Sequence, residues 1–170
     1  MNQLASILHC TVPKGWPPGE YDEPAQRFFL DRMLEGGDEV VGWYGWYGML
    51  RKDFDVLVPL VAVGGFFGPP TETGTVEIGY SVVADWQGKG FATELMEELV
   101  KYAFSDSRVQ RIIAHTTVEN IASCKVLEHI GFNRSNASME PPKVEFKLFR
   151  KGVPSSPGTP VRLRRDRVSI

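Results

Sequence analysis

Residues 76–93 read Val-Glu-Ile-Gly-Tyr-Ser-Val-Val-Ala-Asp-Trp-Gln-Gly-Lys-Gly-Phe-Ala-Thr, which is the most informative stretch of the chain. Its first half belongs to a run over 75–83 whose composition and alternation predict a strand. Gly88-Lys89-Gly90 then leads into apolar residues at three- and four-residue spacing, which predict an amphipathic helix. A helix N-terminus offers unpaired N–H groups and the positive end of the helix dipole. The glycines let a phosphate come close and Lys89 adds a cation, so the stretch predicts a diphosphate cradle.

Comparison with known phosphate-binding patterns limits the kinds of diphosphate ligand that the predicted cradle could bind. The Gly-x-x-x-x-Gly-Lys-Ser/Thr spacing of a Walker loop does not occur in the chain. A dinucleotide fingerprint requires a third small residue after Gly90 and an acidic residue on a following strand. Residues 88–93 fit that pattern poorly, and the strand predicted over 111–117 ends without the acid. A plain glycine-rich turn between a strand and a helix is the remaining alternative.

Helices and strands alternate only in part along the rest of the chain. Asn120 and Gly131 are positioned as the N-cap and the C-terminal stop of a second well-defined helix. The other predicted elements are helices over 2–9 and from about 24 to 34, and strands over 43–49, 54–64, 111–117 and 143–149. Together they predict a mixed α/β (α+β) domain over residues 1–150 with a mainly antiparallel sheet. Residues 151–170 follow as a linker and a basic C-terminal segment.

Composition and charge exclude several classes of protein. A formal net charge of -2 over 170 residues argues against a nucleic-acid-binding domain, which is usually strongly basic. No apolar run reaches the roughly 20 residues needed to cross a bilayer, and the N-terminus lacks the pattern of a signal peptide. Cys10 and Cys124 suit a reducing compartment, and the three histidines have no metal-binding spacing. We therefore expect a cytoplasmic protein that needs no metal and binds neither nucleic acid nor a membrane.

Two motifs in the chain resemble those of one enzyme superfamily. Residues 87–92, Gln-Gly-Lys-Gly-Phe-Ala, resemble the Gln/Arg-x-x-Gly-x-Gly/Ala pyrophosphate motif of the GCN5-related N-acetyltransferases (GNAT superfamily). Residues 120–132, Asn-Ile-Ala-Ser-Cys-Lys-Val-Leu-Glu-His-Ile-Gly-Phe, are similar to the Asn-x-x-Ser…Gly-Phe segment of its ribosomal-protein N-terminal acetyltransferase (RimJ/RimL-like) branch. The similarity covers about residues 40–150. It implies the GNAT fold, a mostly antiparallel mixed sheet of about six or seven strands flanked by about four helices. In that fold a splayed pair of strands forms a slot for acetyl-CoA.

The resemblance assigns cofactor-binding residues position by position. Gly88 to Thr93 would hold the pyrophosphate of coenzyme A through backbone N–H groups. The end of the preceding strand would pair with the amide-bearing pantetheine arm and part from its neighbour at a bulge, for which Gly79 is suited. Asn120 would bind the pantetheine arm, although a capping role alone explains an Asn there. The implied cofactor-binding residues are Tyr80, Ser81, Val82, Gln87, Gly88, Lys89, Gly90, Phe91, Ala92, Thr93, Asn120 and Ser123.

Acetyl transfer to an amine requires a neutral amine, a polarised thioester carbonyl and protonation of the departing thiolate. Glu77 is the candidate base, because apolar neighbours on its strand would make a carboxylate more basic, and a surface ion pair is the alternative. Many members of the superfamily use a tyrosine on the last helix as the acid, but Leu127 stands at that position. The branch resemblance points instead to Ser123, a residue that a helix also tolerates without any function. Trp16, in a proline-rich loop, and Glu77 are the candidates for the acceptor pocket.

These features predict an N-acetyltransferase that moves the acetyl group of acetyl-CoA onto a primary amine in a ternary complex. A protein N-terminus, an amino acid, a polyamine and an aminoglycoside are all open as acceptors. A non-catalytic acyl-CoA-binding sensor or scaffold is the alternative function. Relatives in this branch usually begin with a strand that is missing here, and residues 159–166 resemble that strand. We expect the segment to supply it, within the chain or to the partner in a homodimer, and a disordered tail is the alternative.

Overall fold

The sheet at the centre of the molecule is mixed and mostly antiparallel. The computed structural model describes residues 3–50, 57–136 and 139–151. Within them, seven strands form a sheet in the order β1-β3-β4-β5-β7-β6, and β2 also pairs with β3. β1 is parallel to β3 and β4 is parallel to β5, whereas the other pairs are antiparallel. The strands are β1 (Cys10–Thr11), β2 (Trp46–Met49), β3 (Val58–Phe66), β4 (Thr75–Val82), β5 (Arg111–Thr117), β6 (Asn133–Arg134) and β7 (Lys143–Phe149). The predicted fold class is therefore confirmed.

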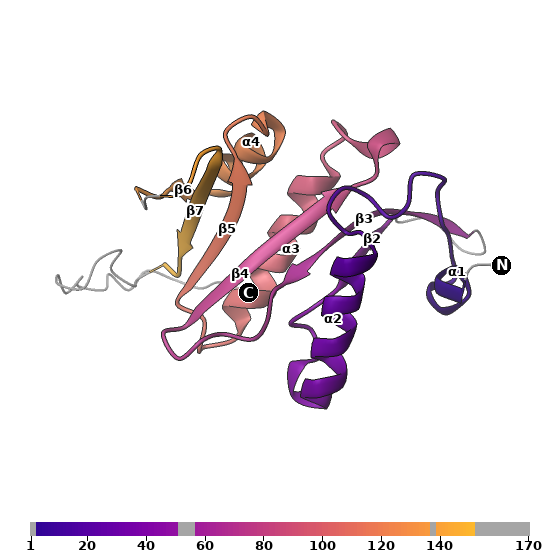
Figure 1. Cartoon of the computed structure of the whole chain (residues 1–170), viewed down its shortest axis with the longest axis horizontal. Helices are drawn as coiled ribbons and strands as arrows, with labels where there is room; N and C mark the ends of the chain where they lie inside the picture. Colours follow the sequence, from indigo (N-terminus) through magenta and orange to yellow (C-terminus); the bar gives the residue numbers. More distant parts are fainter. Residues whose placement is uncertain (1–2, 51–56, 137–138, 152–170) are drawn as a thin grey trace, which may run out of the picture.

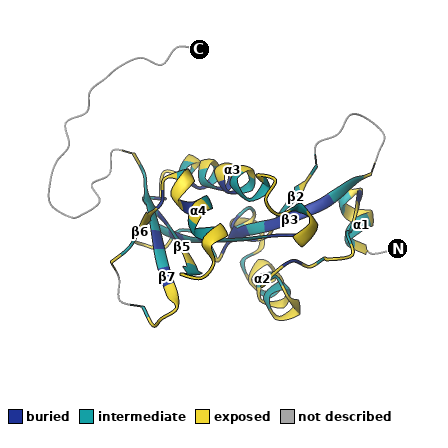
Figure 2. Cartoon of the chain, turned by 90° about the horizontal axis from the view of Figure 1, so that it is seen from above, coloured by how far each residue is buried: buried dark blue, intermediate teal, exposed yellow. Residues whose placement is uncertain are grey.

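Four α-helices flank this sheet in the described part of the chain. They are α1 (Gln3–Leu8), α2 (Glu23–Gly36), α3 (Phe91–Ser105) and α4 (Ile121–Ile130), and short 3-10 helices occupy Gly37–Val40 and Ala84–Trp86. Figure 1 shows their arrangement along the chain. Figure 2 shows α3 and α4 on one face of the sheet and α2 on the other. No helix among the described residues is long and apolar enough to cross a membrane.

The main core lies between the sheet and the inner faces of α3 and α4. The three- and four-residue spacing of α3 places Met96, Leu99 and Ala103 on one buried face. They belong to a cluster that also contains Phe66, Ile78, Ile112, Leu127 and Phe146, all at most 2% exposed. Burying each large apolar side chain contributes roughly 1.5–3 kcal/mol. This core fixes β4, β5, α3 and α4 relative to one another, and these four elements build the site.

The two ends of α4 follow the capping residues read from the sequence. Asn120 Oδ1 accepts a hydrogen bond from the Ser123 N–H at 3.1 Å, and Gly131 ends α4 with a left-handed φ of 103°.

The C-terminal end of α3 is held by Arg150, which no sequence signal had indicated. Its guanidinium donates to three backbone carbonyls, those of Phe104 at 2.9 Å, Asp106 at 2.5 Å and Val109 at 2.6 Å. Arg150 thereby attaches the end of β7 to the end of α3.

β4 and β5 are the pair of strands that part. Their parallel pairing covers only Thr75–Glu77 against Arg111–Ile113, although β4 continues to Val82 and β5 to Thr117. β4 meanwhile keeps an unbroken register with β3, in which Gly79 stands opposite Gly65. The expected distortion at Gly79 is therefore absent, and the gap comes from the end of pairing after Glu77. The predicted splayed pair is present, with its opening two residues earlier than Gly79.

Several predicted boundaries shift in the structure. The strand predicted over 43–49 begins only at Trp46, because Trp43 and Tyr44 are buried in the turns that precede it. The two-residue strands β1 and β6 were not predicted, since two residues are too short to show an alternation. The strand proposed for residues 159–166 lies outside the described residues, so that expectation stays a prediction.

Candidate functional site

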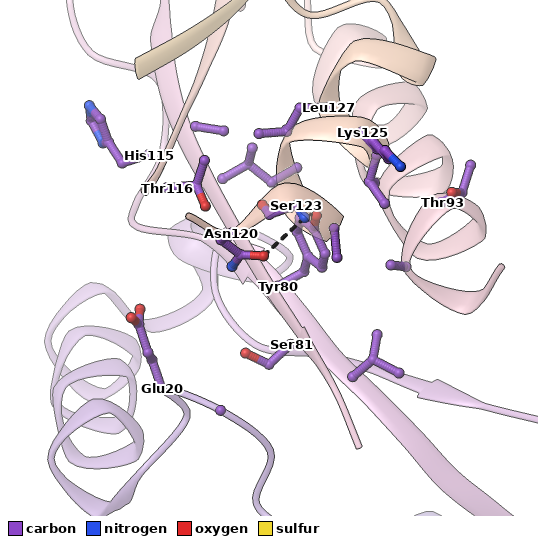
Figure 3. A pocket seen from close by; sticks show the side chains of 18 of the residues that line it. Glu20, Tyr80, Ser81, Thr93, His115, Thr116, Asn120, Ser123, Lys125 and Leu127 are labelled. Atoms are coloured by element: carbon purple, nitrogen blue, oxygen red, sulfur yellow. Dashed lines mark hydrogen bonds between the residues drawn. The ribbon is translucent and has the colours of Figure 1, made fainter. Parts of the chain in front are cut away.

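The candidate site lies where β4 and β5 part, beside the N-terminal ends of α3 and α4. A cleft of about 980 Å³ opens there, enough for a large organic ligand. Figure 3 shows the side chains that line it, from both strands, both helices and the loop before α2. Twelve of the residues predicted from the sequence line this cleft: Glu77, Tyr80, Ser81, Val82, Gln87, Gly88, Gly90, Phe91, Ala92, Thr93, Asn120 and Ser123. Lys89 and Trp16, which were also predicted, do not line it.

The glycine-rich turn forms one end of the cleft. Gly88 and Gly90 have φ angles of 71° and 88°, a left-handed conformation that favours glycine. Gly90 is the N-cap of α3, and its carbonyl accepts the first helical hydrogen bond, from the Glu94 N–H at 3.1 Å. The N–H groups of residues 91–93 precede that bond and are open to a ligand. A Cβ at position 88 or 90 would meet no atom within 4 Å, so the space in front of the turn is free.

The side chains beside this turn differ from the sequence prediction. Gln87 donates from Nε2 to the Val82 carbonyl at 3.0 Å, which ties the turn to the end of β4. Lys89 donates from Nζ to the Asp85 carbonyl at 2.8 Å, with its ammonium 4.8 Å from the centre of the Trp86 ring. The cation assigned to the cradle is therefore turned towards its own loop, because a carbonyl and an aromatic face lie within its reach.

A second lysine stands in the cleft where Lys89 does not. Lys125 lines the cleft from α4, and Figure 3 shows it on the side where Thr93 of α3 lies. Lys125 belongs to the motif of residues 120–132, but no role was predicted for it. The sequence signal for a role of Lys125 in binding was its position in the first half of a helix that begins at the cleft. Only the packing of α4 beside α3 shows where its ammonium lies.

The middle of the cleft brings together Tyr80, Asn120 and Ser123. The Tyr80 hydroxyl donates to Ser123 Oγ at 3.2 Å, which joins β4 to α4 across the cleft. Burial raises the pKa of this phenol, and the hydrogen bond with Ser123 acts in the opposite direction, so Tyr80 stays protonated at neutral pH. Asn120 caps α4 through Oδ1, so its side-chain NH₂ group is the part that can reach a ligand. The Tyr80 hydroxyl was not predicted, because only the backbone of that strand had been given a role.

Glu77 lies at the point where β4 and β5 separate and pairs with a histidine. Glu77 Oε1 is 2.7 Å from His115 Nδ1, and both side chains line the cleft. His115 Nε2 is 3.6 Å from Glu145 Oε2, and Lys147 Nζ is 2.9 Å from Glu145 Oε1. Burial opposes the ionisation of Glu145, but hydrogen bonds and the charges of Lys147 and His115 outweigh it and lower the pKa of that carboxyl. Glu77 therefore has both a position in the cleft and a polar contact with His115, and its roles as a base and as an ion-pair residue both stay open.

Trp16 is the one acceptor-pocket residue that the structure places elsewhere. Its ring centre lies 6.1 Å from that of Tyr21 and 6.0 Å from that of Tyr47, in an aromatic cluster outside the cleft. Gly19 and Glu20, which follow in the same loop, line the cleft instead. Figure 3 shows Glu20 across the cleft from His115. The loop thus contributes to the cleft through Gly19 and Glu20, whereas its tryptophan packs on tyrosines because a large apolar ring is better buried.

No metal centre is formed by the parts of the chain that the structure describes. Within them, no three His, Cys, Asp or Glu side chains are grouped so that they could hold a metal ion. That the protein needs no metal stays a prediction.

Comparison with known proteins identifies the family. Residues 4–133 match the family described as Acetyltransferase (GNAT) domain. The chain therefore belongs to the GNAT acetyltransferase family, as its two motifs had predicted. Curated relatives include the uncharacterized N-acetyltransferase YjdG of Bacillus subtilis (strain 168), 29% identical over 74% of this chain and 71% of YjdG. They also include the [ribosomal protein uS5]-alanine N-acetyltransferase of Escherichia coli (strain K12), 22% identical over 74% of this chain and 57% of that enzyme.

Solved structures share the fold. A probable acetyltransferase superposes with a TM-score of 0.57 and 21% identity over 78% of this chain and 72% of that one. The spermidine N-acetyltransferase SpeG of Vibrio cholerae gives a TM-score of 0.54 and 16% identity, with 74% of each chain covered. The aminoglycoside acetyltransferase AAC(6')-Ib, solved in complex with coenzyme A, gives a TM-score of 0.51 and 18% identity, with 65% of this chain and 69% of that one covered.

Proposed function

We propose that this chain transfers the acetyl group of acetyl-CoA directly to a primary amine while both substrates occupy the cleft. The observation that carries the proposal is the parting of β4 from β5 beside a glycine-rich helix N-terminus. One continuous cleft then has the glycine-rich turn at one end and ionisable groups at the point where the strands separate. Members of this family use acetyl-CoA, and the coenzyme A bound to the aminoglycoside acetyltransferase is consistent with that cosubstrate here.

The residues of the cleft fit the successive parts of the cosubstrate. The N–H groups of residues 91–93 and the turn at 88–90 would bind the pyrophosphate, and the Lys125 ammonium would add positive charge. Beyond Glu77, the edge of β4 that faces β5 has no strand partner among the described residues, while its other edge is paired with β3. Such an edge takes up an extended chain of amides by strand addition, so Tyr80 to Val82 would bind the pantetheine arm. The side-chain NH₂ group of Asn120 would bind the same arm.

Acetyl transfer then needs three contributions from this chain. A backbone N–H of β4 near Tyr80 would polarise the thioester carbonyl as its oxygen becomes negative. Glu77 would accept the proton of the incoming ammonium group, and His115 beside it offers a route for that proton towards solvent. Ser123 would donate its hydroxyl hydrogen to the sulfur as the carbon–sulfur bond breaks. The nitrogen loses two protons overall. Glu77 accepts the first, and the second, released from the nitrogen as the amide forms, restores the Ser123 hydroxyl, so that the sulfur leaves as a thiol.

The acceptor is a primary amine whose approach would be guided by carboxylates. Glu20 and Glu77 both line the cleft, and a negative pair of this kind attracts the ammonium form of an amine. A protein N-terminus, an amino acid, a polyamine and an aminoglycoside all carry such a group. The uS5-alanine, spermidine and aminoglycoside enzymes among the similar proteins act on three of these classes. We keep all four classes as acceptors to be tested.

Titration calorimetry with acetyl-CoA, followed by a turnover assay with one amine from each class, tests the proposal. Tight binding and release of coenzyme A that depends on the amine would support an acetyltransferase. Binding without turnover for any amine would favour the alternative of an acyl-CoA sensor or scaffold. Absence of binding would refute both. The Glu77→Gln variant should bind acetyl-CoA as the wild type does but lose most turnover, roughly 10²- to 10⁴-fold, because it removes the base alone.

A further inference from the structure

We infer that the Tyr80 hydroxyl is a positioning residue that orients the Ser123 hydroxyl towards the sulfur of the leaving group. The contact that carries this inference is the hydrogen bond from the Tyr80 hydroxyl to Ser123 Oγ at 3.2 Å. It joins residues 43 positions apart, on β4 and α4, and both residues line the cleft. The inference rests on the proposed function, because it specifies how the acid of that reaction is prepared.

A serine hydroxyl has one hydrogen to donate and rotates freely unless a neighbour fixes it. When Tyr80 donates to Oγ, the hydrogen of Ser123 cannot point at Tyr80 and must point elsewhere. Within a helix its usual alternative is the carbonyl one turn earlier, but the described residues show no such bond for Ser123. The remaining direction is the cleft, where the leaving group would lie. Tyr80 thus converts a freely rotating hydroxyl into a preoriented donor.

The surroundings of the phenol suit this role and disfavour a role as the acid itself. Tyr80 is half-buried and packs against the main core, so its ring has little freedom to move. Burial raises the pKa of the phenol, which keeps its hydrogen in place over the whole neutral range. The phenol has one hydrogen, and that hydrogen is directed at Ser123 Oγ and not at the cleft. The hydroxyl that has a hydrogen left for the leaving group is therefore that of Ser123.

This arrangement also accounts for the residue at position 127. The tyrosine that many superfamily members carry on the last helix is replaced by Leu127, which is buried and lines the cleft one turn after Ser123. Figure 3 shows Tyr80, Ser123 and Leu127 around the same part of the cleft. In this chain the phenol reaches this region from β4 and acts through a serine. In many superfamily members the phenol would reach the same region from the last helix.

The variants Tyr80→Phe, Ser123→Ala and the double variant test the inference, with Tyr102→Phe as matched control. Tyr102 lies on α3 and donates its hydroxyl to the Val41 carbonyl at 3.3 Å, away from the cleft. The first readout is the ionisation of bound coenzyme A, followed by the ultraviolet absorbance of its thiolate as the pH is raised. Because each single variant weakens or removes the hydrogen bond from Ser123 to the charged thiolate, it should raise the bound thiol's pKa by about one to two units. The double variant should raise it no further.

The second readout is turnover with the best amine found. Tyr80→Phe should lower kcat about tenfold while the dissociation constant of coenzyme A changes less than about twofold, and it should have no effect in the Ser123→Ala background. Tyr102→Phe should match the wild type in both readouts. A Tyr80→Phe variant that leaves the bound thiol's pKa unchanged would overturn the inference. So would an additional loss in the Ser123→Ala background, which would make Tyr80 the direct donor. A wild type that binds coenzyme A but acetylates no amine would overturn the proposed function instead.

Discussion

The diphosphate cradle can be tested by placing a side chain at Gly90. This residue has a φ of 88°, and a Cβ there would meet no protein atom within 4 Å. A new side chain therefore costs about 1–2 kcal/mol of backbone strain but clashes with nothing in the free protein. Gly90→Gln and Gly90→Glu share this strain and have nearly the same shape, so their difference isolates the charge. Both variants should fold, with melting temperatures within a few degrees of each other.

The charge effect follows from Coulomb's law. Two unit charges about 4 Å apart repel by about 1 kcal/mol in water, and a bound pyrophosphate carries about two negative charges. Gly90→Glu should therefore bind coenzyme A about 2 kcal/mol more weakly than Gly90→Gln, which is roughly thirtyfold. Both should bind more weakly than the wild type, because the side chain occupies the space in front of the turn. Titration calorimetry at low salt measures the three dissociation constants.

The outcome that refutes this reasoning is equal affinity of Gly90→Glu and Gly90→Gln. It would mean that no phosphate lies near the N-terminus of α3, whatever ligand the cleft holds. Raising the salt concentration provides an internal check, since screening should reduce the difference between the two variants and leave the strain unchanged. A difference that persists unchanged at 1 M salt would point to a cause other than charge.

Three further predictions concern cations and ion pairs. Lys125→Ala should weaken coenzyme A binding roughly fivefold or more in calorimetry, because Lys125 lines the cleft. Lys89→Ala should weaken it less than twofold, because the Lys89 ammonium is turned to the Asp85 carbonyl. Equal losses of affinity in the two variants would contradict this prediction. Arg150→Met should lower the free energy of unfolding by about 2–4 kcal/mol, seen as a melting-temperature drop of roughly 5–15 °C, with Arg150→Lys intermediate. The pKa of Glu145 is lower in the folded protein than in the unfolded chain, where it is about 4.3. The ionised carboxylate therefore stabilises the fold above that pH, and this contribution is lost as the pH falls through the lower folded-state pKa. Urea titrations should therefore show Glu145→Gln less stable than the wild type at pH 7, with the gap closing below about pH 4.

The elements that the sequence predicted well are those with local signals. β5 and β7 have the predicted limits of 111–117 and 143–149, because each is a short apolar or alternating run. α4 begins and ends where Asn120 and Gly131 indicated, because a cap is a contact between near neighbours in the chain. The glycine turn before α3 was predicted for the same reason. A local pattern can be read from a single sequence, since it depends on neighbours that the sequence itself specifies.

The parts that the sequence did not predict depend on contacts between distant segments. Tyr80 meets Ser123 across 43 positions and Glu77 meets His115 across 38, and neither pair has a spacing rule. The contacts of the Lys89 ammonium could not be predicted either, because a carbonyl and an aromatic ring of its own loop both lie within its reach. Composition and motifs indicate which residues belong to a site. The packing of distant segments determines which atoms of those residues face the ligand.

The parting of β4 and β5 explains why binding groups and reactive groups meet in one place. A strand inside a sheet normally satisfies its N–H and C=O groups on both edges. β4 does so towards β3 along Ile78 to Val82, but towards β5 only as far as Glu77. The open edge that results can be completed by the amides of an extended ligand, so the ligand takes the place of a missing strand. Because that edge starts at Glu77 and runs towards the glycine turn, a ligand held by phosphates at the turn would bring its far end to the Glu77 carboxylate. Under the proposed function, the geometry of the gap would therefore set both the direction of the ligand and the position of its reactive end.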